Sequence, residues 1–228
     1  DGRGEGSSVG GGVDDEGHAA HAGRLAGGEI DSVGGAFADK DVLRAAGDAD
    51  DLDHLSLHAE ALADFFRRNE PHLAPWDPPR PAGITAPEFW AAECGRAVED
   101  YRLGTVLRWV LRLRAAPERV IGRINYTQIA RGPFQSCMLG YAIDHAHEGR
   151  GLMREALEAT IQHVFEVLKL HRIQANYVPE NARSGRLLER LGFVSEGLAK
   201  DYLFIDGAWR DHQLFERTSP VFLQPADW

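Results

Sequence analysis

Three features of the sequence predict a mixed α/β domain whose sheet is neither all-parallel nor all-antiparallel. Three β-rich stretches follow one another between residues 105 and 143. Two stretches with helical periodicity then alternate with a short β-like segment between residues 150 and 191. Asp206-Gly207 separates two further β-like segments, which is a strong hairpin signal. This intermixed order of strands and helices is typical of mixed α/β domains.

Residues 1–40 differ in composition from the rest of the chain. They contain 12 of the 25 glycines and show neither a helical nor a strand period, so a packed core is not expected there. We expect a flexible glycine-rich extension without a catalytic role. The folded domain is then placed at residues 41–218, followed by a short tail over residues 219–228.

The first half of the domain is predicted to be mainly helical. Val42-Leu43-Arg44 is a plausible first strand. The acidic residues 48–51 favour a helix start, because carboxylates stabilise the positive end of the helix dipole, and helical spacing of apolar residues continues to Phe66. The proline-rich segment 72–79 predicts a loop, and a second helix is expected from Pro87 to about Tyr101.

The second half is predicted to alternate between strands and helices. The expected strands are 105–114, 120–129, 134–143, 172–177, 197–205 and 208–216, with a turn at Ala115–Glu118. The expected helices run from about Arg150 to Leu168 and from Asn181 to Leu191, with Gly192 at the position where helices commonly end.

Composition limits the classes of partner. The net charge of -10 and the pI of about 5.4 disfavour direct nucleic-acid binding, and a basic peptide or cationic amine is a better match. Two cysteines, Cys94 and Cys137, exclude a disulfide framework and suit a reducing cytoplasm. Neither a signal-peptide pattern nor a run of 18 apolar residues is visible, so no membrane association is expected and a cytoplasmic location is predicted.

The junction at residues 141–153 is the segment most informative about chemistry. Tyr141-Ala142-Ile143 reads as a strand end, and Glu148-Gly149-Arg150-Gly151-Leu152-Met153 reads as a glycine turn that opens a helix. Unpaired N–H groups at a helix start bind phosphate, and Arg150 can add a charged contact. Alone, the two glycines also fit a simple turn. They lack both the Gly-Lys-Ser/Thr of a P-loop and the third glycine of a dinucleotide site.

Together with this turn, the segment Asn181–Phe193 resembles the GCN5-related N-acetyltransferase (GNAT) superfamily over residues 41–217. Within it the chain is most similar to the RimJ-type branch, the ribosomal-protein alanine N-acetyltransferases. That similarity rests on four blocks of sequence: Leu73–Trp76, Leu139–Tyr141, Arg172–Tyr177 and Lys200–His212.

The resemblance implies a fold and a reaction. The fold would be a central, mixed, mostly antiparallel twisted sheet flanked by helices. The reaction would be direct transfer of acetyl from acetyl-CoA, without a metal, to the N-terminal α-amine of a protein. A ribosomal protein that begins with alanine is the acceptor that the branch suggests. Two alternatives stay open: a small-molecule amine acetyltransferase, and a non-catalytic module that binds coenzyme A or the ribosome. The sequence does not decide between monomer and dimer.

The resemblance also implies roles for individual residues. The expected coenzyme A contacts are Leu139, Tyr141, Ala142, Ile143, Glu148, Gly149, Arg150, Gly151, Leu152, Met153, Asn176, Asn181 and Ser184. The expected acceptor contacts are Trp76, Asn125 and Tyr177, and the candidate catalytic residues are Ser184, Asp201, Tyr202 and His212.

Three positions depart from the family pattern. Glu148 replaces the usual Gln or Arg, and Met153 replaces a small residue. Leu188 stands where many relatives have the tyrosine that protonates the leaving thiolate, so Ser184 is the nearest substitute. His145, like the other histidines near the motif, shows no ligand pattern in sequence and is interpreted as a surface or packing residue.

Overall fold

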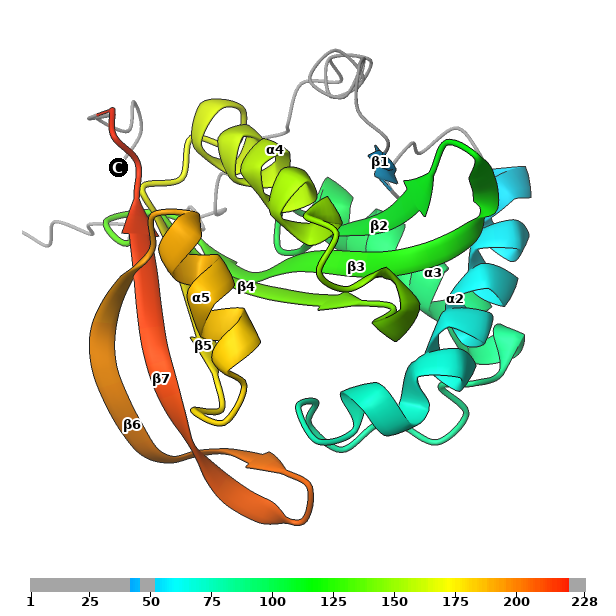
Figure 1. Ribbon diagram of the computed structural model, residues 1–228. Coiled ribbons are helices and arrows are strands. Elements are labelled where there is room, and N and C mark those ends of the chain that lie inside the picture. The colour runs from blue at the N-terminus through cyan, green and yellow to red at the C-terminus, as the bar shows by residue number, and fades with distance from the viewer. Residues whose placement is uncertain (1–41, 46–51, 222–228) are drawn as a thin grey trace, which may run out of the picture.

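The computed structural model describes residues 42–45 and 52–221, with side chains described from residue 58 onward (Figure 1). The extension expected at residues 1–40, the acidic residues 48–51 and the end of the tail lie outside the described residues. The elements are β1 (Val42–Ala45), α2 (Leu52–Leu73), α3 (Pro87–Arg102), β2 (Leu107–Leu113), β3 (Ala116–Ala130), β4 (Ser136–Ile143), η1 (His145–His147), α4 (Leu152–Glu166), β5 (Arg172–Tyr177), α5 (Ala182–Arg190), β6 (Val194–Ile205) and β7 (Ala208–Thr218).

The strands form one seven-stranded sheet in the order β1-β2-β3-β4-β5-β7-β6. Only β4 and β5 pair in parallel, and every other neighbouring pair is antiparallel. The prediction of a mixed, mostly antiparallel sheet is therefore confirmed. Asp206 and Gly207, both with positive φ (50° and 77°), form the expected two-residue hairpin between β6 and β7.

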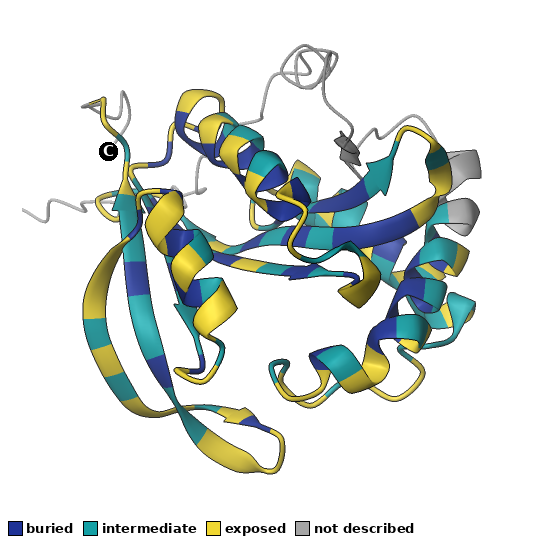
Figure 2. Ribbon diagram, viewed as in Figure 1, coloured by how far each residue is buried: buried dark blue, intermediate teal, exposed yellow. Residues whose placement is uncertain are grey.

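Buried side chains along a strand point alternately to the two faces of the sheet, and this creates two hydrophobic cores, one on each face. Trp109 and Leu111 of β2 pack with α4 and α5, whereas Val110 between them packs with α2 and α3. Successive side chains of a strand point to opposite faces, so α4 and α5 lie on one face and α2 and α3 on the other. Figure 2 shows the buried residues concentrated in the central strands and the exposed ones along β6.

Two predicted boundaries are wrong. Helix α2 continues through Pro71 to Leu73, although the proline-rich segment from residue 72 was expected to be a loop. Pro71 lies only two residues from the helix end, so the loss of one backbone donor is tolerated while Leu73 remains buried. The expected turn Ala115–Glu118 is shorter, because β3 already begins at Ala116, and proline is compatible with the first residues of a strand.

A gap opens in the sheet where β4 and β5 diverge. Their parallel pairing ends at Leu139 and Ala175, although β4 continues to Ile143 and β5 to Tyr177. Helices α4 and α5 follow these two strands, so their N-termini lie at the open end of the gap (Figure 1). Among the described residues, no helix combines the length and the apolar character that crossing a membrane requires.

Candidate active site

A cleft of about 1250 Å³ lies at this gap. It is lined by the ends of β4 and β5, the starts of α4 and α5, the loop after α2, and the β6–β7 hairpin. The predicted site residues that line it are Trp76, Asn125, Leu139, Tyr141, Ala142, Ile143, Glu148, Gly149, Gly151, Leu152, Met153, Asn176, Tyr177, Asn181, Ser184, Tyr202 and His212. Two predicted residues, Arg150 and Asp201, do not line it.

The glycine turn has a conformation that exposes backbone donors. Gly149 and Gly151 have φ of 71° and 80°, in the left-handed region that other residues adopt at a cost. A Cβ at either position would meet no atom within 4 Å, so backbone conformation rather than crowding requires glycine. The first helical hydrogen bond of α4 runs from the Glu155 N–H to the Gly151 carbonyl. The preceding N–H groups are free to bind an anion.

A second helix start and a set of arginines add donor groups and positive charge to the cleft. The Asn181 carboxamide caps α5 by accepting a hydrogen bond from the Ser184 N–H at 3.2 Å, at the position where this helix was predicted to begin. Arg183, Arg186 and Arg190 of α5 also line the cleft. The sequence analysis missed these arginines, although their spacing of three and four residues places them on one helix face.

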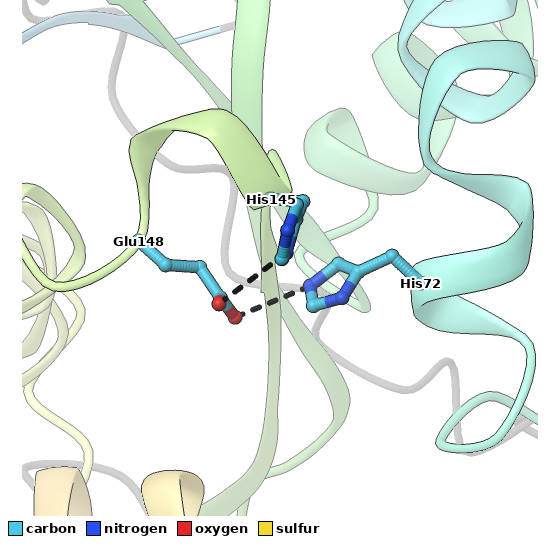
Figure 3. Close-up of side chains that lie close together, drawn as sticks. All are labelled: His72, His145 and Glu148. Carbon is cyan, nitrogen blue, oxygen red and sulfur yellow. Dashed lines mark ion pairs between the residues drawn. The ribbon is translucent and has the colours of Figure 1, made fainter.

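The acidic residue in the turn is neutralised by its neighbours. The Glu148 carboxylate forms an ion pair with Arg183. It also lies 3.2 Å from His72 Nε2 and 3.6 Å from His145 Nδ1 (Figure 3). These contacts hold the carboxylate beside cationic or donor groups, which reduces the expected repulsion of a pyrophosphate. Met153 is only 6% exposed, so its side chain belongs to the hydrophobic core.

A tyrosine and a serine meet where the leaving thiolate is expected. The Tyr141 hydroxyl lies 2.6 Å from Ser184 Oγ, although the residues are 43 positions apart. Burial raises the pKa of Tyr141 to about 12, so its hydroxyl stays protonated at neutral pH. Leu188 is fully buried in the core. The pair formed by Tyr141 and Ser184 can therefore supply the proton-donating function that Leu188 lacks.

The hairpin contributes one ordered imidazole to the opposite side of the cleft. His212 is 2% exposed and its Nδ1 lies 3.0 Å from the Arg210 carbonyl oxygen. A carbonyl can only accept, which assigns the proton to Nδ1 and leaves Nε2 as the basic nitrogen. The Tyr202 ring lies 5.4 Å from the His212 ring. Asp201, by contrast, has a φ of 47° and lies at an irregularity of β6, where its N–H donates to Asp211.

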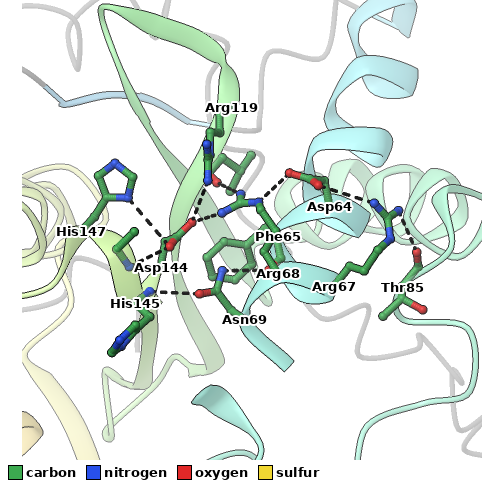
Figure 4. Close-up of polar contacts among 12 residues, drawn as sticks. Asp64, Phe65, Arg67, Arg68, Asn69, Thr85, Arg119, Asp144, His145 and His147 are labelled. Carbon is green, nitrogen blue, oxygen red and sulfur yellow. Dashed lines mark hydrogen bonds and ion pairs between the residues drawn. The ribbon is translucent and has the colours of Figure 1, made fainter. Parts of the chain in front are cut away.

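A buried ionic network holds the glycine turn against α2 (Figure 4). Arg68 of α2 donates to Asp144, which is 3% exposed, and to the Val120 carbonyl at 2.9 Å. Asn69 accepts a hydrogen bond from the His145 N–H at 2.9 Å. Asp144 also caps η1 by accepting from the Ala146 N–H. These contacts fix the segment that leads into Glu148 and the glycine turn.

Comparison with known proteins identifies the family. Residues 43–194 match the acetyltransferase (GNAT) domain model. This chain belongs to the GNAT acetyltransferase family. The family inferred from the glycine turn and the Asn181 helix is thus confirmed, and as a GNAT member the chain is an acyltransferase.

One protein sequence and two solved structures are closely similar to this GNAT chain. The [ribosomal protein uS5]-alanine N-acetyltransferase of Escherichia coli is 44% identical over 159 residues, which are 70% of this chain and 81% of the relative. The ribosomal-protein-S5-alanine acetyltransferase structure from Vibrio fischeri is 39% identical with a TM-score of 0.70, covering 72% of this chain and 90% of that one. Mycobacterium smegmatis RimJ in complex with CoA-disulfide is 32% identical with a TM-score of 0.67, covering 72% and 78%.

Proposed function

We propose that this enzyme transfers the acetyl group of acetyl-CoA to the N-terminal α-amine of ribosomal protein uS5, at an alanine. The observation that carries this proposal is the continuity of the cleft, which is lined by the glycine turn and also by Tyr202 and His212 of the hairpin. A thioester held at one side thus lies beside an acceptor held at the other. The 44% identity with the E. coli uS5 enzyme supports this choice of acceptor, and we place the reaction in the cytoplasm, where uS5 is made.

The residues of the cleft fit coenzyme A. Free N–H groups of the α4 start and the arginines of α5 suit its phosphates. Beyond Leu139 the backbone of β4 has no partner in β5, so it can hydrogen-bond the pantetheine amides. Acetyl-CoA would supply the activated acetyl thioester. Proximity alone can contribute roughly 7–11 kcal/mol to lowering the barrier.

Side chains of this enzyme would then carry out two proton transfers, one from the attacking amine and one to the departing sulfur. His212 Nε2 takes the proton of the attacking amine, directly or through a water molecule. An α-amine has a pKa of about 8, against about 10.4 for lysine, so a modest base is sufficient. Ser184, hydrogen-bonded to Tyr141, returns a proton to the departing sulfur. Trp76, Asn125 and Tyr177 line the cleft and would orient the acceptor peptide.

The test is thiol release from acetyl-CoA with a peptide that copies the N-terminus of uS5. We expect turnover and one added acetyl group, and no turnover when the α-amine is blocked by formylation. Equal or faster turnover of spermidine or free amino acids would indicate a small-molecule enzyme. Tight coenzyme A binding without any turnover would indicate a non-catalytic module. Either outcome refutes the proposal.

The base has its own test. His212→Gln should lower kcat/KM about 100-fold or more, because it removes the basic Nε2. Tyr202→Phe keeps the ring beside His212 and should retain most of kcat/KM. A folded His212→Gln enzyme with the kcat/KM of the parent would exclude His212 as the base.

A further inference from the structure

Three potential metal ligands converge beside the glycine turn (Figure 3). His72 lies in the last turn of α2, His145 begins η1, and Glu148 directly precedes Gly149. One donor atom from each lies within 4.8 Å of the others. His72 and His145 are 73 positions apart, so no local pattern in the sequence predicts this cluster.

The distances from the Glu148 carboxylate to the two imidazoles are close to those between ligands of one small ion, and the three donor atoms together lie within 4.8 Å. Zinc binds nitrogen and oxygen at about 2.0–2.2 Å, so two ligand atoms at tetrahedral angles lie roughly 3.3–3.6 Å apart. Glu148 Oε1 lies 3.2 Å from His72 Nε2, and Glu148 Oε2 lies 3.6 Å from His145 Nδ1. The two imidazole rings lie 4.8 Å apart between centroids. Small side-chain rotations would bring all three donors to bonding distance of one ion.

The backbone that carries the cluster is held firmly, whereas its side chains can adjust. The His145 N–H donates to Asn69 of α2, and Asp144 caps the same turn. The His145 side chain is 72% exposed, which leaves its ring free to turn toward an ion. Arg183, the present partner of Glu148, is 69% exposed. An ion pair with so exposed a partner is weak, so a metal ion can displace it.

We propose that His72, His145 and Glu148 bind one divalent transition-metal ion of the zinc type at the mouth of the coenzyme A cleft. Two imidazoles and one carboxylate form a ligand set that favours zinc and similar ions over magnesium or calcium. The three residues line the same cleft as the glycine turn, which leaves a fourth coordination position for water or a ligand oxygen. The proposal goes beyond acetyl transfer and departs from the expectation of a metal-free site.

Metal binding would strengthen coenzyme A binding. Without a metal ion, the Glu148 carboxylate and its partner Arg183 sum to zero charge next to Gly149. A divalent ion on Glu148 gives carboxylate and ion together a charge of +1 and releases Arg183, which also lines the cleft, toward the phosphates of coenzyme A. Coupling of this kind is reciprocal, so coenzyme A must tighten metal binding by the same factor. We expect a factor of about 10, within the usual range for linked sites.

The first experiment measures zinc directly, without coenzyme A. The full chain is prepared without an affinity tag and with His18→Ala and His21→Ala, so that histidines outside the described residues do not contribute. Titration of Zn²⁺ against a competing chelator should show one site per chain, with no comparable binding of Mg²⁺. Absence of zinc binding above that of Mg²⁺ would overturn the proposal.

Two variants locate the site. His145→Ala removes an exposed ligand and should preserve folding, as circular dichroism would verify. Mutation of a residue that only supports a metal ligand typically lowers metal affinity roughly 10–100-fold. Because His145 is itself a proposed ligand, the zinc affinity of His145→Ala should fall by at least this factor. His171→Ala removes an exposed histidine outside the cleft and should bind zinc like the parent. Equal zinc affinity in parent and His145→Ala would overturn the proposal.

The second experiment measures coupling with acetyl-CoA, whose blocked sulfur cannot chelate zinc. The Kd of the parent for acetyl-CoA should fall about tenfold when zinc replaces a chelator, while the Kd of His145→Ala should not change. An identical Kd with and without zinc in a zinc-binding parent would overturn the coupling. Acetyl transfer to the uS5 peptide is assayed separately in chelator, so a failure of the proposed function is distinguishable from a failure of this one.

Discussion

Gly151→Val tests whether the glycine turn is the phosphate site. Gly151 is the N-cap of α4 with a φ of 80°, where a Cβ meets no neighbouring atom but is conformationally disfavoured. A non-glycine residue there costs of order 1–3 kcal/mol, with β-branched valine toward the upper part. The free enzyme can relieve this strain by rearranging the turn, whereas bound coenzyme A needs the original conformation. The strain energy is therefore subtracted from the free energy of coenzyme A binding, and about 2 kcal/mol corresponds to a roughly 30-fold rise in Kd.

The matched control is Gly104→Val. Gly104 has a φ of 67°, also has no atom within 4 Å of its Cβ position, and does not line the cleft. Isothermal titration with coenzyme A should show weakened binding for Gly151→Val and wild-type binding for Gly104→Val. Thermal denaturation checks that both variants fold. Wild-type affinity in a folded Gly151→Val enzyme would refute the assignment of the turn.

Three further predictions concern proton transfer, the stability contributed by the Asp144 ion pair, and the pH dependence of stability. Tyr141→Phe removes the hydroxyl beside Ser184 and should lower kcat about 10- to 100-fold with little change in coenzyme A affinity. Tyr126→Phe removes a buried hydroxyl bonded to helix α4 and should keep the kcat of the parent. Equal kcat values for the two variants in steady-state assays would contradict this prediction. Asp144→Ala breaks an ion pair whose carboxylate is buried and should lower the free energy of unfolding in urea by about 3 kcal/mol. Glu158→Ala breaks an exposed helical ion pair with Arg154 and should cost less than about 1 kcal/mol. Burial lowers the pKa of His163, so the unfolded chain binds more protons below about pH 6.5 and stability falls as pH decreases. His163→Phe should therefore lose less stability than the parent between pH 7 and 5, and parallel urea-midpoint curves would exclude His163 as a contributor.

Local signals predicted the elements that depend on neighbours in sequence. Asp206-Gly207 predicted the hairpin because two adjacent residues must both adopt positive φ. Asn181 predicted the start of α5, since an N-cap bonds only three residues ahead. The end of α2 was misplaced because burial of Leu73 outweighs the local effect of Pro71. Packing of this kind depends on residues elsewhere in the chain.

The sequence by itself predicted the family, the glycine turn and a set of site residues, most of which line the cleft. Only the tertiary structure decided how the departures from the family pattern are resolved. The divergence of β4 and β5 brings Tyr141 beside Ser184, and the network around Asp144 brings His72 to Glu148. These partners are 43 and 76 positions apart. No local period encodes such contacts, because strand order and helix packing determine which distant side chains meet.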